Sequence, residues 1–337
     1  LYKRNISISL FPIGENCDLS AYDKLDGKLK TWIESSINNR LRTVNSQSQQ
    51  LQLWHLNGSE SKISSCKNTL LTFYELDRPT EEEVNLVKLQ DHVIFGSKYA
   101  CDLFKSLGCN NVSHLPMGID PDFSVNKSRS LEGRTHFILM GKFEKRKHTA
   151  KIIQAWAQRF GNKFEYQLTC CVSNPFFKPE QMNQVVAQAL NGQRYGNINF
   201  LPYLRTNSEV NDLLNSADID LTGLSGAEGW NLPSFNSTCL GKWSTVLNCT
   251  SHKDWATSEN CILLEPTGKE PAVDGVFFHS PGPFNQGNIY SIDDDLLNKA
   301  FDLALTKAGS ENTEGLALAK KLTYSNTVDG ILSTMGV

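Results

Sequence analysis

The sequence predicts an α/β protein with two doubly wound domains, each built on a parallel sheet. Short apolar stretches of strand length alternate with longer segments of helical periodicity along most of the chain, which is typical of βαβ units. The alternation stops over the polar and charged residues 121–133 and then begins again. The 337 residues also exceed the usual size of one domain. We therefore expect a first domain over residues 1–133 and a second that begins at residue 134.

The first half begins with residues 5–11, which alternate like a strand, and continues with helical spacing of apolar residues over 19–41. A later helix is predicted from residue 80, because Thr80 and Glu83 match a capping box. The elements that complete this half are strands over residues 51–56, 69–74, 92–95 and 111–115 and helices over 80–89 and 99–107.

The second half shows the same alternation. Its central stretch, residues 225–246, begins with small residues, forms a short helix that stops at Gly241, and ends in a strand. Residues 267–287 are rich in Gly and Pro and are predicted to form a loop, after which two helices close the chain. The other predicted elements are strands over residues 136–140, 166–172, 198–201, 219–223, 243–247 and 262–265 and helices over 149–160, 181–190 and 207–216.

The composition indicates a globular protein, with 20% charged and 39% hydrophobic residues. A net charge of −3 gives no general attraction to nucleic acid, so a polyanion would need a local basic patch. The chain has no run of about 18 apolar residues, and its nine cysteines lack the spacing of a metal site. We therefore expect a cytoplasmic protein with no stable membrane insertion and no metal or other cofactor.

Two turns carry the residues that could bind an anion. A glycine-rich turn over residues 228–233 leads into a helix N-terminus, whose unpaired amides favour a phosphate or a sugar diphosphate. Another turn places four cations in the six residues 142–147, where Lys142 and Lys147 could hold a diphosphate. The alternatives are an ordinary turn between a strand and a helix and a solvated basic loop, and these residues alone leave both open.

Together these turns resemble the donor half of the retaining GT-B glycosyltransferases of the family-4 type. The matching residues are Gly141-Lys142 followed by Lys147, and about 80 residues later the sequence EGWNLP over 228–233 with Gly241 and a strand behind it. The first half is similar to the same family in the expected order. Its landmarks are TFYELD over residues 72–77, SKY over 97–99 and HLPMGID over 114–120.

The resemblance implies two Rossmann-like domains that face a central cleft. The first is the acceptor domain, residues 134–310 bind the nucleotide-sugar donor, and a helical segment over 311–337 packs back toward the first domain. Two substitutions distinguish the chain: Lys142 stands where the family has Arg, and His148 where it has Gly. The second Glu of the family's Glu-x7-Glu motif falls at Asn236, which can still accept a hydrogen bond from a ribose hydroxyl.

The implied reaction moves a sugar, with retention, from a UDP- or GDP-sugar to an acceptor hydroxyl. The diphosphate leaving group is stabilised by cations and a helix N-terminus without a metal. The implied catalytic residues are Lys142, Lys147 and Glu228, and the implied donor-binding residues are Gly14, Gly141, Gly229, Trp230, Asn231, Leu232 and Asn236. Acceptor-side candidates are His55, Glu75 and His114.

The sequence leaves the acceptor open among a glycan, a small molecule and modified DNA. It also leaves open a different class of function. The uncharged Asn236 is compatible with a degenerate member of the family that binds a nucleotide-sugar or carbohydrate as a subunit without turnover. A third reading is a phosphorylase-like or epimerase-like protein, which releases or alters a sugar without a separate acceptor.

Overall fold

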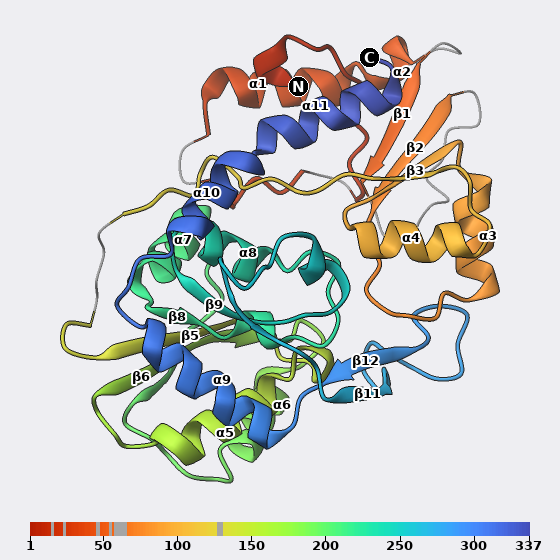
Figure 1. The fold of residues 1–337 in the computed structure, drawn as a ribbon. Coiled ribbons are helices and arrows are strands. Elements are labelled where there is room, and N and C mark those ends of the chain that lie inside the picture. Colours follow the sequence, from red (N-terminus) through yellow and green to blue (C-terminus); the bar gives the residue numbers. More distant parts are fainter. Residues whose placement is uncertain (15–16, 23–24, 45–47, 54–55, 57–65, 127–130) are drawn as a thin grey trace.

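The computed structural model describes residues 1–14, 17–22, 25–44, 48–53, 56, 66–126 and 131–337. Two parallel sheets occupy separate halves of the molecule (Figure 1). The first has the order β1-β2-β3-β4. Its strands are β1 (Gln49–Leu53), β2 (Lys67–Thr72), β3 (His92–Phe95) and β4 (Val112–His114), with helices α3 (Glu81–Leu89) and α4 (Lys98–Ser106) between them.

One face of the first sheet packs against α3 and α4. Leu70, Val93 and Phe95 from the strands share a buried core with Val87 of α3 and Phe104 of α4. Thr80 caps α3 in the predicted capping box, in which its hydroxyl accepts from Glu83 N and the Glu83 carboxylate accepts from Thr80 N. The described segment before this sheet contains the short helices η1 (Tyr2–Arg4), α1 (Gly27–Asn38) and α2 (Arg40–Thr43).

The strand predicted over residues 5–11 is wrong. The sheet begins at β1, and the amide of Leu10 donates to Ser36 O of α1 rather than to a strand. Asn5 has a left-handed φ of 54°, which is incompatible with an extended start. Alternation marks a segment with one apolar side, and here that segment lies on helices, so the pattern did not specify a pairing partner.

The second sheet has the order β10-β9-β8-β5-β6-β7, all parallel. After β7 the chain returns to the other side of β5, so the strand order reverses between β5 and β8. Ligands of doubly wound proteins bind at this kind of reversal, beyond the carboxyl ends of the strands. The strands are β5 (Thr135–Lys142), β6 (Tyr166–Ser173), β7 (Ile198–Phe200), β8 (Ile219–Asp220), β9 (Trp243–Leu247) and β10 (Ile262–Leu264).

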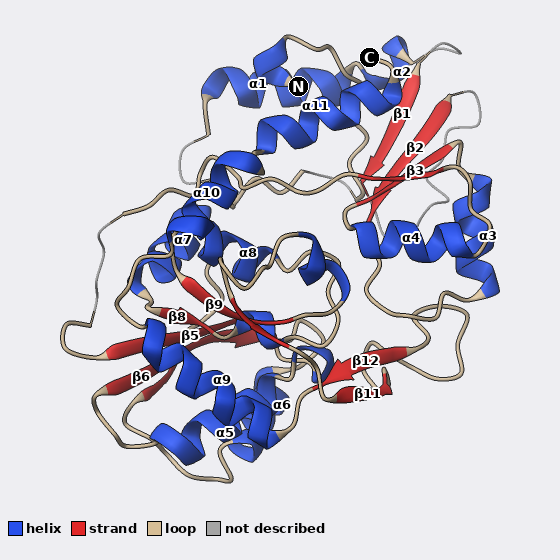
Figure 2. Cartoon of the chain, in the orientation of Figure 1, coloured by secondary structure: helices blue, strands red, loops and turns tan. Residues whose placement is uncertain are grey.

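Helices cover both faces of the second sheet (Figure 2). Ile152, Trp156 and Phe160 of α5 pack with α6 and α9 on one face, and Leu213 and Leu214 of α7 pack on the other. The helices of this half are α5 (Thr149–Phe160), α6 (Pro179–Ala189), α7 (Asn207–Ser216), α8 (Leu232–Cys239), α9 (Asp294–Lys307) and α10 (Thr313–Lys321).

Two features at the end of the chain differ from the sequence prediction. Residues 267–287 were expected to form a loop, but β11 (Gly268–Pro271) pairs antiparallel with β12 (Asn288–Ser291). These strands are four residues each and largely polar, so they carry no alternating signal. We call residues 268–291 the interdomain hairpin. Three helices follow it instead of two, the third being α11 (Tyr324–Met335).

Helix α11 returns to the first half of the molecule (Figure 1). Ile119 and Thr323 form an isolated parallel bridge, and the Thr327 hydroxyl donates to Pro116 O at 2.9 Å. Arg4 Nη2 lies 2.7 Å from Asp329 Oδ1. A Cβ on Gly118 would clash with the Thr323 backbone, so glycine permits this approach.

Candidate active site

A pocket of about 550 Å³ lies between the two sheets, where its lining comes from both halves of the chain. This volume is within the range of small-molecule sites. The first half contributes Leu53, Leu71, Phe73, Tyr74, Glu75 and Leu76, from the carboxyl ends of β1 and β2 onward. The second half contributes Lys142, Glu144, Arg146, Lys147, Phe277, Phe278, Asn285 and the residues 228–233.

The turn that follows β5 brings its cations into the pocket. Lys142 ends the strand, and the 3-10 turn η3 (Lys145–Lys147) then places Arg146 and Lys147 in the wall. His148 has a left-handed φ of 53° and buries its ring, with Nδ1 2.8 Å from Leu224 O. A position that requires a positive φ favours glycine. His148 therefore adopts a backbone conformation that favours glycine, while its buried ring contacts Leu224 O.

The turn over residues 228–233 meets the same pocket from the other side of the strand reversal. Asn231 has a φ of 66° and precedes α8, whose first turn contains Pro233. The Asn231 amide donates to Thr222 O at 3.1 Å and to His252 Nε2 at 2.9 Å. Burial lowers the pKa of His252 to about 4, so its neutral ring can accept this hydrogen bond. The start of α8, with its free amides, is thereby fixed at the pocket.

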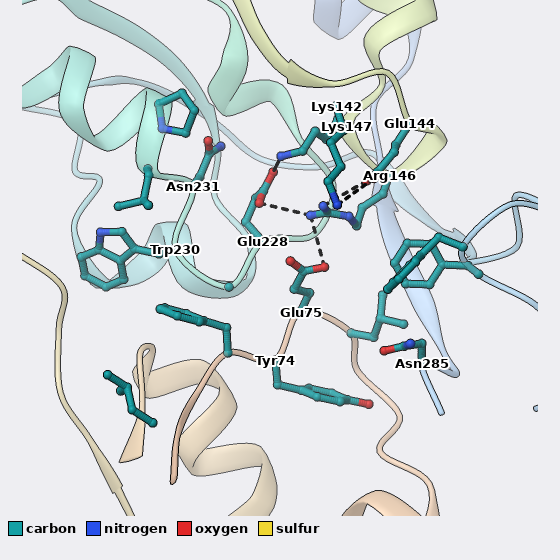
Figure 3. Close-up of a pocket in the computed structure, with 18 of the residues that line it drawn as sticks. Tyr74, Glu75, Lys142, Glu144, Arg146, Lys147, Glu228, Trp230, Asn231 and Asn285 are labelled. Carbon is teal, nitrogen blue, oxygen red and sulfur yellow. Dashed lines mark hydrogen bonds and ion pairs between the residues drawn. The ribbon is translucent and has the colours of Figure 1, made fainter. Parts of the chain in front are cut away.

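An ion-pair network crosses the floor of the pocket (Figure 3). Lys147 Nζ lies 2.5 Å from Glu228 Oε1, and Arg146 Nη1 lies 3.1 Å from Glu228 Oε2. The same Arg146 Nη1 lies 3.3 Å from Glu75 Oε2, and its Nη2 lies 3.1 Å from Glu144 Oε2. Arg146 also donates to Ala227 O. One buried guanidinium thus contacts carboxylates from both halves of the molecule.

These partners shift the protonation of the network. Burial raises the pKa of the Glu228 carboxyl, but Lys147 and Arg146 outweigh it and hold that pKa well below its usual range. Burial is also the largest influence on Glu75; it raises the pKa of this carboxyl, although Arg146 opposes it. Burial lowers the pKa of Arg146, but the carboxylates of Glu75, Glu228 and Glu144 together raise it. The guanidinium therefore remains charged.

The two walls touch directly at an aromatic residue. A Cβ on Gly229 would lie 2.6 Å from Phe73 Cβ, and a Cβ on Gly96 would clash with the Phe73 ring. The Phe73 side chain therefore fits between two glycines, one from each half of the chain. The absence of both side chains lets the walls approach closely enough for Arg146 to reach Glu75.

The interdomain hairpin ties the halves together at the edge of the pocket. Asp77 accepts from Lys269 Nζ at 2.7 Å and from Asn288 N at 2.8 Å. Asn285 N donates to Glu83 Oε1 at 2.8 Å. Another tie lies at η5 (Thr250–Asp254), where Asp254 Oδ2 accepts from Lys98 N at 2.6 Å, at the start of α4.

The structure brings most of the sequence-selected residues to one place. Those that line the pocket are Lys142, Lys147, Glu228, Gly229, Trp230, Asn231, Leu232 and Glu75. Gly141, with a φ of 115°, lies behind Lys147, and a Cβ there would lie 3.6 Å from the Lys147 chain. Asn236 is buried in α8 and is not among the described lining residues; its Oδ1 has no hydrogen-bond partner in the described part of the chain.

Three other candidates are not found in the pocket lining: two lie away from it and one lies outside the described residues. Gly14, with a φ of 96°, sits in an exposed turn and is not among the described lining residues. His114 is not among them either; its Nε2 lies 3.6 Å from Asp254 Oδ2. His55 lies outside the described residues. In the described ranges, no group of three or more His, Cys, Asp or Glu side chains could hold a metal ion.

Sequence reasoning missed several lining residues. Arg146 and Glu144 stood inside the basic turn, but a run of charges does not tell which members point inward. Phe277 and Asn285 come from the hairpin, which was expected to be a loop.

No protein-family model and no curated protein sequence matches the chain. Solved structures match most of it at low identity. HepE from Anabaena in complex with UDP-glucose is 13% identical with a TM-score of 0.66, over 93% of this chain and 90% of that chain. Sucrose-phosphate synthase from Thermosynechococcus elongatus is 12% identical with a TM-score of 0.66, over 91% and 77%. The chain has the GT-B fold.

The GT-B match extends to larger proteins. Two structures of TarM, one of them the S. aureus protein, match at 8% identity with TM-scores of 0.58 and 0.61, and the chain spans only 52% and 56% of their length. At these identities the comparison establishes the architecture of two Rossmann-like domains facing a cleft. None of the helices in the described ranges is long and apolar enough to cross a membrane.

Proposed function

We propose that this protein is a glycosyltransferase that moves a sugar from a UDP- or GDP-sugar to an acceptor hydroxyl. One observation carries the proposal. The Lys142–Lys147 turn and the Glu228 turn, about 80 residues apart in the chain, line one pocket at the strand reversal of a GT-B fold. Reversals of this kind bind nucleotides in doubly wound domains, and HepE, which shares the fold, was solved with UDP-glucose.

The diphosphate of the donor binds between Lys142, Lys147 and the start of α8. Lys142 is half exposed at the pocket rim, 3.7 Å from Glu144 Oε1. Lys147 contacts Glu228, and a phosphate oxygen would compete for the same ammonium group. The free amides and the positive end of the helix dipole add to the attraction for an anion. Residues 134–310 thus act as the donor domain.

The donor sugar and ribose are held by the same turn and helix. Glu228, kept ionised by its two cations, accepts hydrogen bonds from sugar hydroxyls. The backbone of Gly229, Trp230, Asn231 and Leu232 contacts the sugar and phosphate. The unpartnered Oδ1 of Asn236 accepts from a ribose hydroxyl. Gly14 belongs to the loop that closes over the phosphates.

Transfer proceeds with retention and without a metal. The bond from the anomeric carbon to the diphosphate breaks while the acceptor oxygen bonds to the same face of that carbon. The acceptor proton moves toward the departing phosphate oxygen. Lys142, Lys147 and the α8 N-terminus stabilise the negative charge that develops on the leaving group. The acceptor lies on the side of residues 1–133, near Glu75, with His55 and His114 as further candidates.

The purified chain tests this proposal with UDP-glucose and GDP-glucose in separate reactions containing EDTA. We expect slow hydrolysis of at least one donor, followed by the release of free UDP or GDP. NMR of the first product should show the same anomeric configuration as the donor. Added Mg²⁺ should not raise the rate. Absence of both hydrolysis and calorimetric binding for the two nucleotide-sugars, or an inverted product, would contradict the proposal.

A subunit that binds a nucleotide-sugar without turnover is the second candidate. The observation that favours it is Asn236, which lacks the charge of the family's second Glu. Calorimetric binding of UDP-glucose with no release of UDP over a day would support the binding subunit. For either function we propose a cytoplasmic location, since all nine cysteines are free.

A further inference from the structure

The wall that faces the donor turns is mostly apolar. Leu53 ends β1 and is 62% exposed, and Phe73 follows β2 and is 43% exposed. Leu232 and Phe277 from the second domain line the same pocket with exposures of 54% and 39%. We call the two residues of the first domain, Leu53 and Phe73, the apolar wall. Exposed apolar side chains that converge on one pocket are typical of a binding site for an apolar group.

Among the described lining residues of the first domain, Glu75 is the one that carries a charged group. Tyr74 is committed to the core, because its hydroxyl donates to Glu83 Oε2 at 3.0 Å. Glu75 contacts Arg146 and lines the pocket. The lining cations Lys142, Arg146 and Lys147 all come from the second domain. A phosphate group on an acceptor would therefore find no cation among the described lining residues of the first domain, and it would meet the carboxylate of Glu75, which already pairs with Arg146.

We propose that the acceptor is an uncharged hydroxyl compound with an aromatic or aliphatic body. The apolar wall binds that body, and the acceptor hydroxyl lies toward Glu75. This inference rests on the proposed function, because the acceptor is defined by the transfer. A pocket of about 550 Å³ has room for a donor sugar and a compact acceptor group. Sugar phosphates and DNA, whose phosphates would meet Glu75, are disfavoured.

Three probes with the same sugar separate these classes: methyl β-glucoside, phenyl β-glucoside and glucose 6-phosphate. We would measure their binding to the full chain by calorimetry with saturating UDP. Phenyl β-glucoside should bind at least about tenfold more tightly than methyl β-glucoside, because the ring loses apolar surface to the wall. Glucose 6-phosphate should bind most weakly. Equal affinities, including no detectable binding of any probe, or a preference for glucose 6-phosphate would overturn the inference.

A matched pair of variants assigns the preference to the wall. Leu53→Gln keeps the size of the side chain but makes it polar, so the preference for the phenyl ring should fall to about threefold or less. Leu89→Gln is the control, since Leu89 at the end of α3 is 65% exposed and is not among the lining residues. A Leu53→Gln protein that keeps the full preference would overturn the assignment.

UDP binding separates this inference from the proposed function. Both variants should bind UDP like the unaltered chain, which also shows that they are folded. If the unaltered chain binds no UDP and hydrolyses no donor, the glycosyltransferase proposal fails. The three probes are then compared without UDP, and their order of affinity still decides whether the wall prefers an apolar body. If UDP binds and a donor is hydrolysed but the probes bind equally, only the inference about the acceptor fails.

Discussion

The two walls of the cleft differ in chemistry and in the way they are held. The donor wall carries paired charges, with Lys147, Arg146 and Glu228 fixed by contacts of 2.5 to 3.1 Å. The opposite wall presents exposed apolar side chains such as Leu53 and Phe73. Buried charges need partners in defined directions, whereas apolar contact has no direction. The donor wall is therefore suited to one chemical group, and the apolar wall to a class of shapes.

A few direct contacts join the two walls. Arg146 reaches Glu75, the Phe73 side chain fits against Gly229, and the interdomain hairpin binds Asp77. If the comparison is correct, removing a charge from the donor wall should have large effects. Removing one contact between the halves should have smaller ones, because several contacts share that role.

The largest effect is expected from Arg146→Met. The substitution removes the buried guanidinium that pairs with the carboxylates of Glu75, Glu144 and Glu228. We expect a loss of about 3 to 5 kcal/mol in the free energy of unfolding, measured by urea denaturation. Lys145→Met is the control from the same turn: Lys145 pairs with the partly exposed Glu270, and its loss should cost less than about 1 kcal/mol. Equal losses in the two variants would refute the distinction.

Lys147→Met should abolish most of the reaction while leaving the protein folded. Without this ammonium the charge on the leaving diphosphate is less stabilised, and we expect donor hydrolysis to slow by about 100- to 1,000-fold. The rate is measured as UDP or GDP release at saturating donor, with thermal unfolding as the check on folding. Lys145→Met should retain a rate within about threefold of the unaltered chain. A similarly mild effect at Lys147 would remove it from the catalytic group.

The contact between Asp254 and α4 should show a pH dependence. Burial raises the pKa of Asp254 from 3.8 to about 6. The folded protein therefore holds this proton where the unfolded chain has released it, and the stability due to Asp254 is lost as the pH rises from about 4 to 6. We compare the free energy of unfolding of the wild type with that of Asp254→Asn. Relative to the variant, the wild type should lose about 2 kcal/mol of stability between pH 4 and pH 7.

A matched carboxylate provides the control for that pH dependence. Asp302 of α9 is exposed and pairs with Arg159 of α5. Asp302→Asn should leave the dependence of stability on pH as it is in the unaltered chain. If Asp254→Asn also has the same dependence of stability on pH as the unaltered chain, Asp254 does not hold an extra proton in the folded protein.

The smallest effect is expected from Asp77→Asn, which weakens one tie of the interdomain hairpin. The substitution removes the charge that Lys269 Nζ meets at 2.7 Å and should cost about 1 kcal/mol. Hydrogen exchange should become faster within residues 268–291. Glu270→Gln, on the same hairpin but paired with Lys145, should leave the exchange at Asn288 unaltered. Protection that persists in Asp77→Asn would show that other contacts hold the hairpin.

Local elements were predictable because their signals are local. The bounds of α5, α7, β3 and β9 match the predicted residues, and the capping box at Thr80 forms as expected. These segments combine a clear apolar period with a distinct start or stop residue. The strand over residues 5–11 failed for the opposite reason: its alternation was real, but a strand also needs a partner, and Leu10 N donates to Ser36 O of α1 instead of to the sheet.

The site was predictable only in part. Lys142, Lys147, Glu75 and the turn from Glu228 were identified from residue type and order, and they do line one pocket. Arg146 was not singled out, because its importance depends on carboxylates that lie 2, 71 and 82 residues away in the chain. Long-range partners of a single charge leave no periodic trace in the sequence.

The sequence by itself determined the alternation of strands and helices and the two turns that bring charge and free amides to strand ends. Those features follow from propensity and periodicity within a few residues. Only the tertiary structure decided that Arg146 joins both walls, that the interdomain hairpin ties the two halves together, and that Leu53 and Phe73 face the donor turns. These contacts depend on how whole domains pack against each other. Such packing brings together residues that are far apart in the sequence, so no local pattern predicts it.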